Sequence, residues 1–164
     1  MSKIFLMLAF VLLSCNFEKP TTFTDLALKD SVYTLNNQQL SIADMLAKYK
    51  GKKIVIDVWA SWCGDCVRGL PAVRNLQKQY KDVVFLFLSV DQSKTSWKRA
   101  VKRFNMQGAH FILPKGMKDG DFVDFIKLGW IPRYMVINER GKIALFKATS
   151  ASDSDIEKAL NTSL

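Results

Sequence analysis

The sequence is poor in residues that bind metals. Its 164 residues include three cysteines and one histidine, His110. A structural zinc site normally takes four protein ligands. The one close pair is Cys63 and Cys66, and His110 follows far along the chain. We therefore expect no metal centre.

Long apolar runs are also missing. No run reaches the ~18 residues that a membrane-spanning helix needs, and no repeat of fixed period is present. Apolar residues make up 49% of the chain and charged residues 24%, which is typical of a folded globular protein. This composition excludes a collagen-like or largely disordered chain, and the length predicts one domain.

Acidic residues are outnumbered, 15 against 24 Lys and Arg, which gives a formal charge of +9. A basic chain can bind nucleic acid, anionic lipid or acidic partners. No nucleic-acid motif accompanies the basic residues, so we expect no nucleic-acid partner. A solvated face and a docking patch both remain open for the densest groups, which are Lys48, Lys50, Lys52 and Lys53, and then Lys98, Arg99, Lys102 and Arg103.

The N-terminus resembles a bacterial lipoprotein signal. Lys3 precedes ten apolar residues at 4–13, and the run ends in Leu12-Leu13-Ser14-Cys15. A run of this length is a signal-peptide core rather than a membrane span. The resemblance to a lipobox implies that Cys15 becomes the N-terminus and carries lipid. A plain secretory peptide with an incidental Cys, or a buried helix, is the alternative.

This interpretation divides the chain into a signal at 1–15, a tether at 16–22 and a domain at 23–164. It predicts an exported lipoprotein, anchored to a membrane and facing the periplasm or the cell exterior. Two thiols then remain in the domain, in a compartment where disulfides form and exchange.

The domain alternates predicted strands and helices. Apolar, β-branched runs at 53–60 and 83–90 predict strands buried on both faces. Other strands are predicted at 23–28, 32–35, 110–113, 134–138 and 143–148, the last two joined by a Gly-containing turn. Helices are predicted at 42–49 after Ser41, at 63–80, at 97–104 after Thr95 or Ser96, at 119–126, and up to 160 after Ser152 or Asp153. This order predicts an α/β sheet with a closing antiparallel hairpin.

The pair Cys63-Gly64-Asp65-Cys66 follows a buried strand and opens a helix. A bare C-x-x-C is weak evidence, because zinc and iron–sulfur proteins also use it. Here the first Cys sits where unpaired N–H groups and the helix dipole stabilise a thiolate. The second Cys is one turn deeper and within disulfide reach. We therefore predict that Cys63 attacks and Cys66 resolves.

The segment IVIDVWASWCGDC resembles the active site of the thioredoxin superfamily. The lipobox, the early hairpin and the long middle resemble its exported TlpA/ResA-like thiol–disulfide oxidoreductases. The resemblance covers about 23–160. It implies a thioredoxin-like α/β fold, with a central mixed sheet flanked by helices, an N-terminal β-hairpin extension and an inserted helix and strand within 93–126. It also implies a redox-active disulfide as the sole redox group, without a cofactor.

A second segment, Gly129-Trp130-Ile131-Pro132-Arg133, falls where this family carries a cis-proline. The resemblance implies a cis Ile131–Pro132 bond facing the Cys pair, with substrate peptide pairing to the backbone before it. An ordinary trans proline is the alternative. We expect Ile131, Arg133 and the exposed Trp62 to contact substrate.

Asp57 falls where thioredoxins carry a buried acid beneath the Cys pair. Burial would raise its pKa, and it could take the proton from Cys66 during resolution. An Asp bonded to backbone at a strand edge is the alternative. The family's usual cationic neighbour of this acid is absent, because Phe87 stands at its position.

Three other departures concern charge at the site. Asp65 stands where the family usually has Pro, and its carboxylate should raise the pKa of Cys63. Arg133 and Arg68 are candidates for restoring positive potential. Gly69 stands where exported relatives often have an acid.

The leading hypothesis is a monomeric oxidoreductase that exchanges disulfides with protein substrates and with a membrane or soluble redox partner. We expect it to act as a reductant. A copper-binding or copper-delivery module using the Cys pair and His110 is the alternative. The remaining functional alternatives are a peroxidase on the same fold and a redox-inactive binding module.

Overall fold

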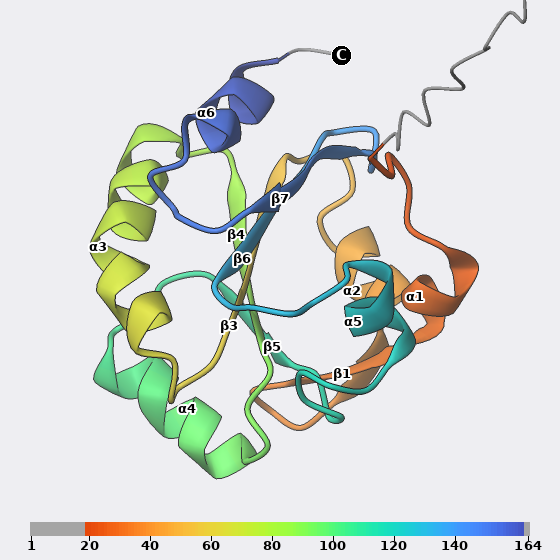
Figure 1. Ribbon diagram of the computed structural model, residues 1–164, viewed down its shortest axis with the longest axis vertical. Helices are drawn as coiled ribbons and strands as arrows, with labels where there is room; N and C mark the ends of the chain where they lie inside the picture. Colours follow the sequence, from red (N-terminus) through yellow and green to blue (C-terminus); the bar gives the residue numbers. More distant parts are fainter. Residues whose placement is uncertain (1–18, 163–164) are drawn as a thin grey trace, which may run out of the picture.

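A mixed seven-stranded sheet runs through the centre of the protein, with helices on both of its faces (Figure 1). This computed structural model describes residues 19–162. The predicted signal, the predicted lipid site Cys15 and most of the predicted tether therefore lie outside the described residues. Within 19–162, no helix is long and apolar enough to cross a membrane.

The strands lie in the order β2-β1-β5-β4-β3-β6-β7. Strand β3 is parallel to β4 and antiparallel to β6, and β4 is parallel to β5. An antiparallel pair forms each edge of the sheet, β1 with β2 at one edge and β6 with β7 at the other. The bounds are β1 Ser31–Thr34, β2 Gln39–Ser41, β3 Ile54–Trp59, β4 Val84–Ser89, β5 Ala109–Ile112, β6 Arg133–Ile137 and β7 Ile143–Ala148.

The helices form two groups. In Figure 1, α3 (Gly64–Gln79), α4 (Lys94–Arg103) and α6 (Ser154–Asn161) cover one face of the sheet, while α1 (Asp25–Lys29), α2 (Ile42–Ala47) and α5 (Asp121–Phe125) cover the other. Every residue of β3 is buried, and β4 is buried from its second residue onward. The predicted pair of fully buried central strands is therefore confirmed, and with it the thioredoxin-like mixed sheet.

The prediction of a strand at 23–28 is wrong. This segment forms α1, in which Thr24 Oγ1 accepts the Ala27 N–H at 3.2 Å as an N-cap. Within this segment Leu26 is exposed and Ala27 is buried. The cap at Thr24 and the acidic residue Asp25 in the first turn favour the helix. The N-terminal hairpin exists, but β1 and β2 form it.

The other helices begin at or near the residues predicted from the sequence. Ser41 and Asp44 form the capping box of α2, and Asp153 caps α6, as predicted. Helix α4 begins three residues earlier than expected, because Ser93 Oγ, rather than Thr95 or Ser96, accepts the Ser96 N–H. Together α4, β5 and α5 form the predicted insertion, which places β5 between β1 and β4.

The two ends of the sheet have different neighbours. Strand β3 and helix α3 meet at the lower end of the molecule in Figure 1, whereas residues 19–22 enter at the upper end. There the Thr21 carbonyl accepts the Ile143 N–H at 2.8 Å. All core side chains of the described part lie between Ala27 and Leu160. A chain beginning at Lys19 thus keeps every described element and the whole described core.

Candidate active site

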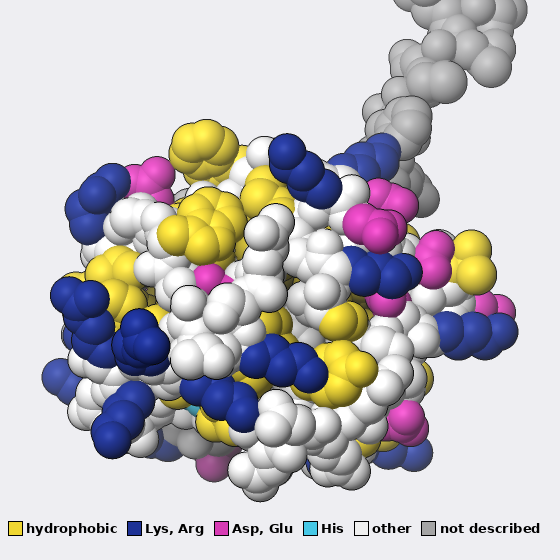
Figure 2. All heavy atoms as spheres, turned by 90° about the horizontal axis from the view of Figure 1, so that it is seen from below, with side chains coloured by type: hydrophobic (Ala, Val, Ile, Leu, Met, Phe, Trp, Pro, Cys, Tyr) yellow, Lys and Arg dark blue, Asp and Glu magenta, His cyan; other side chains and the backbone are white. Residues whose placement is uncertain are grey.

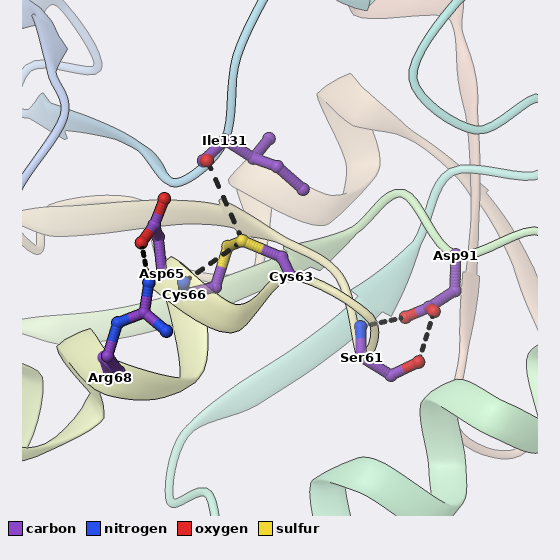
Figure 3. The surroundings of a disulfide bond; sticks show 7 residues. All are labelled: Ser61, Cys63, Asp65, Cys66, Arg68, Asp91 and Ile131. Carbon is purple, nitrogen blue, oxygen red and sulfur yellow. Dashed lines mark hydrogen bonds and ion pairs between the residues drawn. A yellow bond between two sulfur atoms is a disulfide. The ribbon is translucent and has the colours of Figure 1, made fainter.

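Cys63 and Cys66 form a disulfide at the head of α3 (Figure 3). The Cα atoms lie 5.3 Å apart, and both residues are buried. Cys63 is the N-cap of the helix, and its Sγ accepts the Cys66 N–H at 3.1 Å. Because N–H groups at a helix start favour negative charge, this geometry stabilises a thiolate on Cys63 after reduction.

The proline segment lies against this disulfide. The Ile131–Pro132 peptide bond is cis, as the resemblance implied. The Ile131 carbonyl oxygen lies 3.7 Å from Cys63 Sγ. Ile131 and Pro132 are buried, so their backbone forms a wall beside the sulfur.

Asp65 and Arg68 form an exposed ion pair on the first turns of α3 (Figure 3). The Arg68 guanidinium lies across Gly64, since a Cβ built there would be 3.2 Å from Arg68 Nη1. The cation therefore lies next to the residue that follows Cys63. Arg68 neutralises part of the negative charge that Asp65 brings to the site, although exposure to solvent weakens both effects.

Asp91 holds the turn that leads into Cys63, a role that the sequence analysis missed. Its carboxylate accepts the Ser61 N–H at 2.9 Å, the Ser61 hydroxyl at 2.6 Å and the Ser89 hydroxyl at 2.8 Å. Asp91 is 2% exposed. The available signal was an acid directly after a buried strand, at the sheet edge where α/β proteins place their sites.

Asp57 lies on β3 and is fully buried, as predicted. Burial raises the pKa of its carboxyl to about 8, and the neighbouring Tyr134 hydroxyl offsets part of this shift. Tyr134 is the cross-strand partner of Asp57 on β6. Burial and the neighbouring Asp57 carboxyl raise the pKa of the Tyr134 hydroxyl in turn.

The Tyr134 side chain also lies against α3 at Gly69. Its hydroxyl lies 3.4 Å from the position that a Cβ on Gly69 would occupy. Gly69 lies one helical turn after Cys66. The hydroxyl of Tyr134, and with it the neighbouring carboxyl of Asp57, therefore lies beneath the first turns of α3.

Arg133 is buried and turned toward α5. Its Nη1 donates to the Ile126 carbonyl at 2.6 Å, at the C-terminal end of that helix. A cation at this end of a helix interacts favourably with the helix dipole. Burial lowers the pKa of the guanidinium. Arg133 thus anchors α5 beside the proline segment, and its effect on the Cys63 sulfur stays a prediction.

His110 is buried and stacked on Phe87, with ring centroids 5.0 Å apart. One ring nitrogen, Nε2, lies 3.0 Å from the Met106 carbonyl oxygen. Burial lowers the pKa of the imidazole. Residues 19–162 contain no group of three or more His, Cys, Asp or Glu side chains that could hold a metal ion.

Two tryptophans near the Cys pair are exposed. Trp62 precedes Cys63, Trp130 precedes Ile131, and each is 62% exposed. Trp130 lies within the proline segment, but the sequence did not identify it as a residue that contacts substrate. The end of the molecule where α3 begins shows hydrophobic side chains among Lys and Arg (Figure 2). A hollow of about 550 Å³ beside Trp62 is lined in part by Asp91, Lys115 and Lys118.

The fold, with a disulfide at the head of α3, places the protein among the thioredoxin-like proteins. The Redoxin family matches residues 22–160, and the chain belongs to this family. The protein is a thiol–disulfide oxidoreductase with a C-x-x-C pair, as the sequence predicted.

Three relatives illustrate this membership. Thioredoxin-like protein YneN of Bacillus subtilis is 26% identical over 80% of this chain and 74% of its own length. Thiol-disulfide oxidoreductase ResA of Geobacillus kaustophilus is 26% identical over 71% of this chain, which spans 66% of that relative. A solution structure from Bacteroides vulgatus, assigned to the thiol-disulfide oxidoreductases, is 32% identical with a TM-score of 0.66 and 91% coverage of both chains.

Proposed function

We propose that the protein reduces disulfides in client proteins through Cys63 and Cys66. The Cys63 thiolate attacks one sulfur of the client disulfide, which forms a mixed disulfide and releases one client thiolate. The Cys66 thiolate then attacks Cys63 Sγ, which releases the second client thiol. Two electrons pass to the client, and the Cys63–Cys66 disulfide remains. The observation that carries the proposal is Cys63 Sγ at the helix start, where it accepts the Cys66 N–H.

Asp57 is the candidate base for the second step. Its pKa of about 8 is close to that of a free thiol, ~8.5. A base matched in this way can accept the Cys66 proton and return it in the reverse direction. Its position beneath the start of α3 supports this role, with Tyr134 tuning its affinity for the proton.

The surroundings of the pair favour reduction of clients over oxidation. A strongly oxidising couple has a stabilised thiolate in its reduced form. Here Asp65 places negative charge on the first turn of α3, and Arg68 offsets only part of it. The remaining negative charge of Asp65 disfavours a thiolate, so the oxidised form of the couple should be favoured and the reduced form should donate electrons readily.

The client surface should be the end that carries Trp62, Trp130 and the backbone of Ile131. Two exposed indole rings, each next in the chain to a residue in contact with the sulfur or bearing it, can bury apolar client side chains. We further propose that the chain is exported and anchored through lipid on Cys15, with a membrane or soluble protein restoring its dithiol. Its catalytic unit is a monomer.

Trapping of mixed disulfides tests this function. Cys66→Ser removes the resolving thiol, so an oxidised client should accumulate as a covalent adduct on Cys63 that dithiothreitol reverses. Cys63→Ser is the matched control and should trap little. Equal trapping by the two variants would contradict the assigned roles, and no adduct or reduction by the unmodified protein would indicate a redox-inactive module.

A further inference from the structure

A groove of about 520 Å³ lies at the end of the sheet opposite Cys63. It runs between α2, the loop before β3 and the β6–β7 turn, at the upper end of the molecule in Figure 1. Its volume is within the range of small-molecule sites. Its lining includes apolar side chains from several elements, namely Phe23, Leu28, Leu46, Tyr49, Ile54 and Ile137.

Basic side chains surround this apolar lining. Lys50 and Lys52 come from the loop before β3, and Arg140 and Lys142 come from the β6–β7 turn. Glu139 also lines the groove, but its carboxylate lies 3.5 Å from Lys53 Nζ. None of the four rim cations forms an ion pair with a residue in the range 19–162. The rim therefore carries positive charge above an apolar interior.

The groove lies where the N-terminal segment joins the fold. Thr22 and Phe23 line it, and Thr21 is bonded to the first residue of β7. Six peptide steps separate Cys15 from Thr21, and they span at most ~22 Å when fully extended. A lipid on Cys15 would therefore hold this end of the domain close to the membrane surface.

We propose that the groove binds an anionic phospholipid of the membrane to which the chain is tethered. The phosphate would lie among Lys50, Lys52, Arg140 and Lys142, and part of an acyl chain would lie against the apolar lining. Apolar burial and attraction to anionic headgroups are the two contributions that hold proteins at a bilayer surface. The inference rests on the proposed tether for its choice of membrane lipid over a soluble amphiphile.

This contact would orient the enzyme. Strand β3 separates the groove from Cys63, and its six residues span ~20 Å. With the groove on the membrane, Trp62, Trp130 and the Cys pair face away from it. The tether alone would let the domain rotate, whereas the groove would hold the active site toward clients in solution.

Vesicle binding by the chain beginning at Lys19 tests the groove without the lipid anchor. This chain should co-sediment with vesicles containing 30% phosphatidylglycerol and at least about tenfold less with pure phosphatidylcholine. Lys52→Glu combined with Lys142→Glu should lower binding to the anionic vesicles about tenfold. The matched control is Arg99→Glu with Lys102→Glu, which makes the same charge change on α4 and should retain binding.

A second measurement separates the groove from charge alone. Dihexanoyl-phosphatidylglycerol should shift the methyl resonances of Leu46 and Ile137, whereas glycerol phosphate should not. Equal losses in the two double variants, or no methyl shift, would overturn the proposal. Disulfide exchange is measured on the same samples. If the unmodified chain exchanges disulfides but does not bind anionic vesicles, the groove is contradicted and the proposed function still stands.

Discussion

At the scale of single residues, charge around Cys63 decides how readily its thiol ionises. The helix start stabilises the thiolate, Asp65 opposes it, and Arg68 neutralises part of Asp65. The sequence predicted Asp65 as the opposing group. It favoured Arg133 as the cation near Cys63 and named Arg68 as a further candidate, because spacing alone does not show which way a long side chain turns. The structure pairs Arg68 with Asp65 and turns Arg133 to α5.

Substitutions at the ion pair should move the pKa of Cys63 in opposite directions. Asp65→Asn removes the negative charge and should lower it, while Arg68→Gln removes the cation and should raise it. Both side chains are exposed, so each shift should be below about one pKa unit. Thiolate absorbance of the reduced protein, followed against pH, measures both. Shifts of the same sign in the two variants would refute this electrostatic account.

The buried Asp57 should make stability depend on pH. An unfolded Asp loses its proton near pH 4, whereas Asp57 in the folded protein keeps its proton up to about pH 8. Stability is therefore unaffected below pH 4 and falls as pH rises from 4 to 8. Oxidised Asp57→Asn should be more stable than the parent at pH 7 by a few kcal/mol, and no more stable at pH 4.

Denaturant unfolding of the oxidised proteins across this pH range measures the difference. Asp25→Asn, at an exposed position on α1, serves as the control and should show no such trend. A difference between Asp57→Asn and the parent that does not change with pH would show that Asp57 is not protonated in the folded state.

At the scale of elements, the sequence predicted best where one physical signal dominated. The almost wholly apolar segments around β3 and β4 predicted buried strands, and the Cys pair after β3 predicted the start of the next helix. Prediction failed for α1, where five residues hold too little periodicity to separate helix from strand. It also missed the Asp91–Ser61 contact, because no local pattern pairs residues 30 positions apart.

The contact between Asp91 and Ser61 should set the position of Cys63. Asp91→Asn keeps the size of the side chain but weakens its bonds to the Ser61 N–H and hydroxyl, at a cost of about 1–3 kcal/mol in stability. A loosened turn should also slow alkylation of reduced Cys63 and client reduction at fixed pH. Gln92→Ala, next in the chain and exposed, is the control. Unchanged alkylation in a destabilised Asp91→Asn protein would limit Asp91 to a structural role.

At the scale of the whole molecule, the active site and residues 19–22 lie at opposite ends of the sheet. Local sequence could not show this, because it follows from the direction of β3 and from the pairing of Thr21 with Ile143. The arrangement suits the proposed anchor, since the proposed client surface with Trp62 and Trp130 would then face away from the membrane.

Loss of the lipid anchor should therefore leave disulfide exchange unchanged. The chain beginning at Lys19 should reduce clients in solution as fast as the full-length protein, because it keeps the whole described core. Cys15→Ser should abolish lipid processing and leave the Cys63–Cys66 couple unchanged. Mass spectrometry of the native N-terminus checks the lipid, and cleavage at another residue or an unmodified Cys15 would show a simply secreted protein.

The reduction potential of the Cys63–Cys66 couple decides whether this pair is a working reductant. The protein is equilibrated in glutathione or dithiothreitol buffers of graded potential, and the fraction oxidised is read after acid trapping of the thiols. The account predicts a reversible two-electron transition more reducing than about −200 mV, in the range of thioredoxin-like reductants. A potential near the −120 mV of strong oxidants, or a pair that never equilibrates with the buffer, would contradict it.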